Sequence, residues 1–142
     1  MKELEESVVG YVIDGDTLEL IDGNRVRIIG IDAPELGRFG DEDEPFAIEA
    51  TEFAKKIAER QKIWLQAEGN NKDVHGRLRR HIWIDKPTDV NCTIEAKEKL
   101  FSSKLLLQGY ASVMIIGDVK HEDLFKKLEN IAISNCVGIW SF

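Results

Sequence analysis

Two short stretches of the sequence concentrate charged side chains in a way that suggests metal and phosphate chemistry. The stretch "DGDT" places Asp14 and Asp16 on either side of a glycine. The stretch "RVRIIGIDAPE" carries Arg27 inside an apolar run and closes on Asp32 and Glu35. Carboxylates held close together repel one another unless a cation neutralises them. Because carboxylate oxygens are hard ligands that select Ca²⁺ or Mg²⁺, the two stretches predict a divalent metal site if they fold against each other.

A third stretch, "HGRLRRH", supplies a second arginine. Arg77 follows a glycine at the mouth of a predicted strand, where its planar guanidinium would hold a phosphate in a two-point contact. Together with Arg27 it would clamp a phosphate from both sides, while Glu35 would take a proton from water. A base, a metal and two arginines together describe the hydrolysis of a phosphodiester bond.

The individual motifs also have simpler structural explanations, and the parity of two residues does not fit the functional interpretation directly. "DGDT" is typical of a hairpin turn, and the acidic stretch 41–44 of a solvated loop. Strand alternation puts Arg27 and Asp32 on opposite faces, because their numbers differ in parity. Both side chains reach one site only if the strand is distorted between them, and we expect that distortion at Gly30.

The pattern of apolar residues indicates the elements that must hold these side chains. Strands are predicted over 7–13, 17–21, 25–31, 62–68 and 78–84. Helices are predicted from Pro45 to about residue 60, over 94–109 and over 118–135, with an extended segment over 111–116. Five short strands with a helix inserted after the third favour a barrel of the OB type. We therefore expect an α+β, mainly β fold: a five-stranded Greek-key OB-fold barrel with three α-helices.

Length and composition set wider limits. With 142 residues, 43% of them hydrophobic and no repeat, the chain is expected to form a single domain over 1–142 with its core at about 8–140. The sequence shows neither a signal peptide nor a membrane-spanning apolar run. We expect a cytoplasmic monomer without a membrane partner, and export as part of a longer precursor stays open as an alternative. The net charge of −7 argues against broad nucleic-acid binding but permits a local site where a metal supplies positive charge.

In the order of these motifs, the chain resembles staphylococcal nuclease and its family of thermonucleases. From about residue 8 onwards it carries "VIDGDTLEL", "RVRIIGIDAPE", "EPFAIEATEFAKK", "DVHGRLRRHIW", "LLLQGYASV" and "HEDLFKK…GIWS". The resemblance implies Ca²⁺-dependent cleavage of DNA or RNA, in single-stranded or unpaired regions, with 3′-phosphate products. It implies metal ligands at Asp16, Asp32, Glu35 and the backbone carbonyl of Ala33, a general base at Glu35, catalytic arginines at Arg27 and Arg77, and substrate contacts from Arg27, Arg77 and His75.

The chain departs from the family pattern where the substrate would be held. Val74 and His75 stand in place of a lysine–tyrosine pair. Two pocket tyrosines of the family fall at Ile115 and Gly117. Because bases stack on aromatic rings, these changes are expected to weaken nucleotide binding. Two functions stay open: a Ca²⁺-dependent nuclease with altered substrate binding, which the complete catalytic set favours, and a weakly active or inactive OB-fold module that binds single-stranded nucleic acid or a protein partner.

Overall fold

Strands rich in β-branched residues form a closed barrel. The computed structural model describes residues 4–141. The barrel order is β1-β2-β3-β6-β5, and a separate two-stranded sheet joins β4 to β7. The bounds are β1 (Glu5–Asp14), β2 (Thr17–Leu20), β3 (Arg25–Ile28), β4 (Ile31–Asp32), β5 (Lys62–Lys72), β6 (Leu78–Trp83) and β7 (Ser112–Val113). Neighbouring barrel strands are antiparallel except β3 and β6, which are parallel. The predicted α+β fold with a five-stranded OB-type barrel is therefore confirmed.

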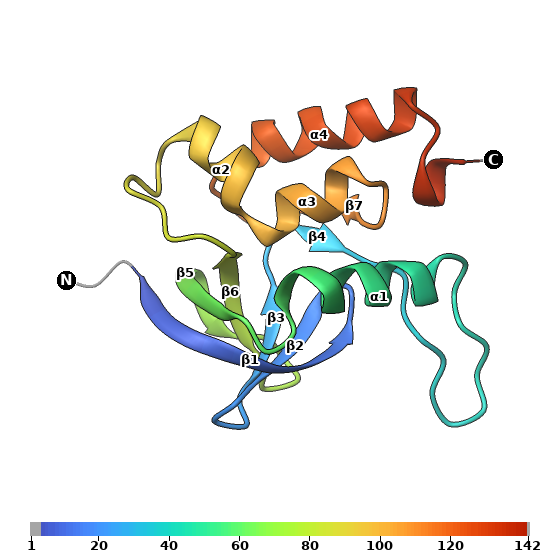
Figure 1. Ribbon diagram of the computed structural model, residues 1–142, viewed down its shortest axis with the longest axis horizontal. Helices are drawn as coiled ribbons and strands as arrows, with labels where there is room; N and C mark the ends of the chain where they lie inside the picture. The colour runs from blue at the N-terminus through green and yellow to red at the C-terminus, as the bar shows by residue number, and fades with distance from the viewer. Residues whose placement is uncertain (1–3, 142) are drawn as a thin grey trace.

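Four α-helices within the described residues pack on this barrel, the first beside it and the other three together over one end (Figure 1). They are α1 (Ala47–Ala58), α2 (Thr93–Lys99), α3 (Phe101–Leu107) and α4 (Glu122–Ser134), followed by a short 3-10 helix (Gly138–Trp140). Helix α1 packs beside β1, whereas α3 packs against both β6 and α4. Trp83, Phe101 and Phe125 are fully buried, so the core extends from the barrel into the helical layer. No helix of this part of the chain is both long and apolar enough to cross a membrane.

The number of helices differs from the prediction of three, because the segment over 94–109 forms two helices instead of one. Leu100, between α2 and α3, has an extended backbone with φ −77° and ψ 135°. It makes a bridge to Trp83 at the end of β6, and both side chains are completely buried. Pairing with the barrel and burial of the leucine side chain thus interrupt a sequence that favours continuous helix.

The other two helices begin later than predicted. Helix α1 starts two residues after Pro45, and α4 starts four residues after Asp118. In each case the residue before the helix has a left-handed backbone conformation, with φ 68° at Phe46 and 66° at His121. Because the right-handed helix cannot pass through such a residue, neither helix extends further upstream.

The predicted strand over 25–31 is interrupted at Gly30. Strand β3 ends at Ile28, and the chain then turns to pair β4 with β7 outside the barrel. Gly30 has φ +93°, and a Cβ atom there would lie 2.6 Å from the ring of Phe125 in α4. Glycine is therefore required both for the backbone conformation and for the close approach of α4. The distortion expected from the parity of Arg27 and Asp32 is confirmed.

Candidate functional site

The turn between β1 and β2 contacts the segment that follows β4. Asp14 and Asp16 in this turn are buried, with 4% and 3% of their surface exposed. Oδ2 of Asp16 accepts a hydrogen bond from the backbone N–H of Ala33 at 2.8 Å. Oδ1 of Asp16 accepts one from the hydroxyl of Thr17 at 2.9 Å. The two acidic stretches therefore fold against each other, which was the condition for the predicted metal site. They do so at one rim of the barrel, which carries Asp14, Asp16 and Asp32.

Arg27 joins this turn to the end of β4. Its Nη1 donates hydrogen bonds to the backbone carbonyls of Ile28 and Ile31, at 2.8 and 2.7 Å. These bonds hold the guanidinium inside the bend between β3 and β4. Its Nη2 lies 3.4 Å from Oδ2 of Asp16 and 3.5 Å from Oδ1 of Asp32. Because of the bend, one arginine faces both carboxylates despite the parity of the sequence.

The carboxyl groups of this rim outnumber the arginines that contact them. Burial raises the pKa of Asp32, the charge of Asp16 raises it further, and Arg27 opposes this rise. Burial, together with the charge and hydrogen bond of Asp16, raises the pKa of Asp14 to about 7. Arg38 lies 3.4 Å from Asp14 and only partly offsets this effect. An additional cation at this rim would therefore be stabilised.

The loop before β6 fixes the second arginine. Oδ1 of Asp73 accepts hydrogen bonds from the backbone N–H groups of His75 and Arg77, at 2.9 and 3.0 Å. Oδ2 of Asp73 accepts one from Nε of Arg77 at 2.7 Å. Nη1 of Arg77 lies 3.5 Å from the hydroxyl oxygen of Thr17, which is the register partner of Arg27. The two arginines thus occupy neighbouring positions on one surface.

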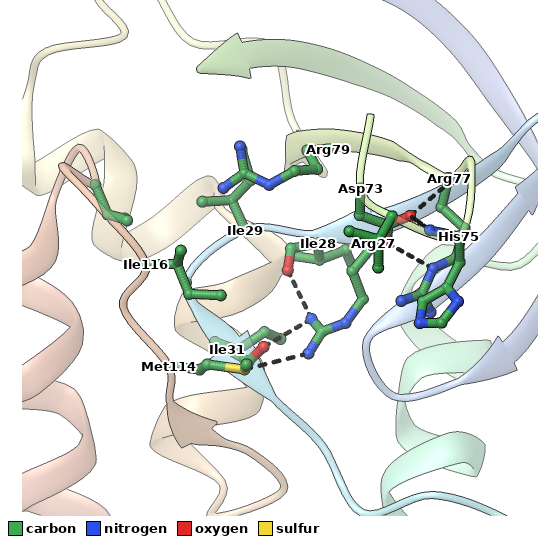
Figure 2. A pocket seen from close by; sticks show the side chains of 13 residues that line it. Arg27, Ile28, Ile29, Ile31, Asp73, His75, Arg77, Arg79, Met114 and Ile116 are labelled. Carbon is green, nitrogen blue, oxygen red and sulfur yellow. Dashed lines mark hydrogen bonds and ion pairs between the residues drawn. The ribbon is translucent and has the colours of Figure 1, made fainter. Parts of the chain in front are cut away.

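Arg27, His75 and Arg77 line one cleft of about 250 Å³, as Figure 2 shows. The three predicted substrate-contacting residues are therefore brought together. Arg79 lines the same cleft and is the register partner of Arg27 in the parallel pair of β3 and β6. The sequence reasoning missed Arg79. Its only signal was the spacing of two residues from Arg77, which strand alternation places on the same face.

Another side of the cleft is apolar. Its residues include Met114, Ile116 and Val119. Sδ of Met114 lies 3.7 Å from Nη2 of Arg27. The resemblance placed the positions of the pocket tyrosines at Ile115 and Gly117, but Ile115 packs against the hydrophobic core, and neither residue lines the cleft. In this chain the apolar side chains that line the cleft are those of the neighbouring residues Met114 and Ile116, since alternate residues of an extended segment face opposite sides.

Glu35 is not among the residues that line the cleft. Its side chain is exposed. Its backbone N–H donates to Oε1 of Glu44 at 2.7 Å, and its backbone carbonyl accepts from the N–H of Glu44 at 3.0 Å. Within residues 4–141, no three acidic, histidine or cysteine side chains form a group that could hold a metal ion. The structure therefore does not assemble Glu35 with Asp16 and Asp32 into one set of ligands.

Two of the predicted ligands nevertheless suit a calcium ion. Asp16 and Asp32 direct carboxylate oxygens at the same nitrogen of Arg27 and repel each other. Ca²⁺ binds about six to eight oxygen atoms from carboxylates, backbone carbonyls and water. The residues that would hold such an ion are Asp16, Asp32 and the backbone carbonyl of Ala33. The donor set fits a hard cation by its chemistry.

The closed barrel and the arginine-lined cleft beside buried carboxylates define an OB-fold protein with a cationic site in an acidic chain. A model of the family described as "Staphylococcal nuclease homologue" matches residues 25–142, which is most of the sequence. The chain belongs to the staphylococcal nuclease family, as its motifs predicted.

Individual relatives agree with this family. The thermonuclease of Staphylococcus intermedius is 28% identical over 141 residues, covering 96% of this chain and 76% of that protein. The thermonuclease of Staphylococcus hyicus is 28% identical over 134 residues, covering 92% and 72%. The probable endonuclease LCL3 of Podospora anserina is 29% identical over 122 residues, covering 82% of this chain and 41% of that protein. The chain is thus a nuclease homologue along nearly its whole length.

Proposed function

We propose that the protein is a Ca²⁺-dependent nuclease that hydrolyses phosphodiester bonds in single-stranded DNA or RNA. The observation that carries this proposal is the single cleft shared by Arg27 and Arg77, beside the carboxylates of Asp16 and Asp32. Guanidinium groups match the oxygens of a phosphate in geometry and charge. The relatives named as thermonucleases and as a probable endonuclease support the same class of reaction.

In this proposal the two arginines bind the non-bridging oxygens of the phosphate. Nη1 of Arg27 is engaged by protein carbonyls, whereas its Nη2 lies 3.4 and 3.5 Å from the two carboxylates, which is longer than a direct hydrogen bond. Nη2 therefore has capacity for a phosphate oxygen. Both guanidinium groups would stabilise the negative charge that develops as the bond to phosphorus changes. A Ca²⁺ ion held by Asp16, Asp32 and Ala33 would supply further positive charge at the phosphate.

Glu35 is the proposed general base. Its carboxylate accepts a proton from water as the water oxygen forms a bond to phosphorus. The bond from phosphorus to the 5′-oxygen breaks, the 5′-oxygen takes up a proton from solvent, and the product ends in a 3′-phosphate. Glu35 lies three residues after Asp32 on an exposed loop. Catalytic contacts often tighten only when the substrate binds, so the exposed position is compatible with this role.

The test is cleavage of single-stranded DNA and RNA with added Ca²⁺, compared with the same reaction in a chelator. We expect cleavage only with Ca²⁺, and a loss of about 10²–10⁴-fold in kcat for Glu35→Gln with an unchanged melting temperature. Glu42→Gln is the matched control, since Glu42 is an exposed carboxylate of the same loop. Ca²⁺-dependent cleavage that survives in Glu35→Gln would exclude Glu35 as the base. Ca²⁺ binding without cleavage of any substrate would favour the binding-module alternative.

A further inference from the structure

Arg79 has a fixed position in the cleft. Its side chain is half-buried, and its Nη1 donates hydrogen bonds to the backbone carbonyls of Glu68 and Asn70, at 3.1 and 3.3 Å. Both carbonyls belong to the C-terminal half of β5. Nη2 and Nε of Arg79 have no hydrogen-bond partner among the described residues. The guanidinium is therefore anchored to the protein through Nη1, and the N–H groups of Nη2 and Nε remain for a ligand.

Arg79 also differs from the other two arginines of the cleft in its ion pairing. Arg27 is paired with two carboxylates and Arg77 with Asp73. Arg79 forms no ion pair with any carboxylate in the part of the chain that the structure describes. A half-buried guanidinium without an acidic partner is costly to maintain, and a ligand rich in hydrogen-bond acceptors would reduce that cost.

Arg79 lines the cleft together with the apolar residues Met114 and Ile116. Figure 2 shows Arg79, Met114 and Ile116 on one side of Arg27, and Arg77 on the other. Met114 and Ile116 leave 42% and 65% of their surface exposed, although both are apolar. A phosphate is poorly suited to this end, since its charged oxygens would lose water against apolar side chains. A nucleobase is better suited, because it combines apolar faces with a polar edge.

We propose that this end of the cleft binds a nucleobase and that Arg79 selects guanine. The inference rests on the proposed function, because the base must belong to a nucleotide whose phosphate is held by Arg27 and Arg77. Guanine presents two adjacent acceptors, O6 and N7, on one edge, whereas adenine presents an amino donor in place of O6. The free Nη2 and Nε donors of Arg79 match this pair in a two-point contact. A purine ring also covers more of Met114 and Ile116 than a pyrimidine does.

The experiment compares initial cleavage rates of single-stranded oligonucleotides that differ at one nucleotide beside a defined cleavage position, on either side in turn. The variable base is guanine, adenine, cytosine, thymine or 7-deazaguanine, which lacks the N7 acceptor. We expect kcat/KM to be about fivefold higher or more for guanine than for the other bases, including 7-deazaguanine. Arg79→Ala and Arg79→Lys should both lose this preference, because lysine keeps the charge but not the planar fork. Arg25→Ala should retain it, since Arg25 is an exposed arginine paired with Glu19.

The outcomes separate this inference from the proposed function. Equal rates for guanine and 7-deazaguanine in the wild-type protein would overturn guanine selection, and this comparison does not depend on the folding of any variant. A uniform loss of rate for all bases in Arg79→Lys, with the wild type indifferent to the base, would instead assign Arg79 to a phosphate. If Ca²⁺ supports no cleavage, the proposed function fails. Fluorescence anisotropy of the same oligonucleotides in a chelator then decides: tighter binding of guanine than of 7-deazaguanine supports the base site, and equal affinities overturn it.

Discussion

Replacing Asp14 by asparagine should stabilise the protein at neutral and alkaline pH. Burial, together with the charge of Asp16, raises the pKa of Asp14 from 3.8 to about 7. By the linkage between pKa and stability, ionised Asp14 therefore lowers the free energy of unfolding by up to about 4 kcal/mol. Because the folded pKa lies above the unfolded one, this penalty is absent below the unfolded value and grows as the pH rises to about 7.

The substitution removes little else. Asparagine keeps an oxygen that can accept the backbone N–H of Asp16, which lies 3.3 Å from Oδ1 of Asp14. The ion pair with Arg38 is lost, but the Arg38 side chain is 50% exposed and such pairs contribute at most about 1 kcal/mol. We therefore expect Asp14→Asn to raise the free energy of unfolding by about 2–3 kcal/mol at about pH 8, and by much less at about pH 4.

Urea unfolding between about pH 4 and pH 8, in the presence of a chelator, measures this difference. The chelator is needed because a bound cation would itself offset the charge of the rim. Asp118→Asn is the control, because Asp118 is exposed and its substitution removes the same formal charge. Equal stability of Asp14→Asn and the wild type at alkaline pH would refute the reasoning. So would a stabilisation of the same size at both ends of the pH range.

Three further perturbations test other parts of the structure. Gly30→Ala should lower the free energy of unfolding by about 2–4 kcal/mol in urea titrations, because the new Cβ would lie 2.6 Å from the ring of Phe125 in α4. Gly23 has a similar φ but no atom within 4 Å of the added Cβ, so Gly23→Ala should cost about 1 kcal/mol. A hydrogen bond from His81 lowers the pKa of Glu68, so Glu68→Gln should cost about 1–2 kcal/mol at neutral pH and progressively less below the ordinary pKa of 4.5; thermal melts across this range measure the trend. In thermal melts, Ca²⁺ at a hundred times its wild-type Kd should stabilise the wild-type protein by about 2.7 kcal/mol. The same Ca²⁺ concentration should stabilise the Asp16→Asn variant far less, because one proposed ligand is lost.

The barrel could be predicted from the sequence because strand alternation and turn residues are local signals. The bend at Gly30 could also be predicted, since two residues of opposite parity had to reach one site. The break at Leu100 could not, because the residues over 94–109 favour helix and only the distant partner Trp83 opposes it. Local patterns therefore predict where elements form, but long-range pairing decides where some of them end.

The same distinction between local patterns and long-range pairing applies to the residues of the candidate site. Asp16 and Arg27 were predicted because their motifs lie on consecutive strands joined by short turns. Arg79 was missed, because its place in the cleft follows from the parallel pairing of β3 with β6, which brings together strands far apart in the chain. The cleft lining by Met114 and Ile116 was not predicted either, because a shift of one residue exchanges the two faces of an extended segment.

The bend at Gly30 connects the carboxylate rim, where the metal is proposed to bind, to the end of the cleft where the base is proposed to bind. The turn there brings Asp32 to Arg27, and the carbonyl of Gly30 also accepts the backbone N–H of Met114 at 2.9 Å. One bend thus positions a proposed metal ligand and a proposed base-contacting residue. Gly30→Ala, studied below its melting temperature, should therefore weaken both Ca²⁺-induced stabilisation and oligonucleotide affinity, whereas Arg79→Ala should weaken only the second. Loss of one property without the other in Gly30→Ala would show that the two ends of the site are positioned independently.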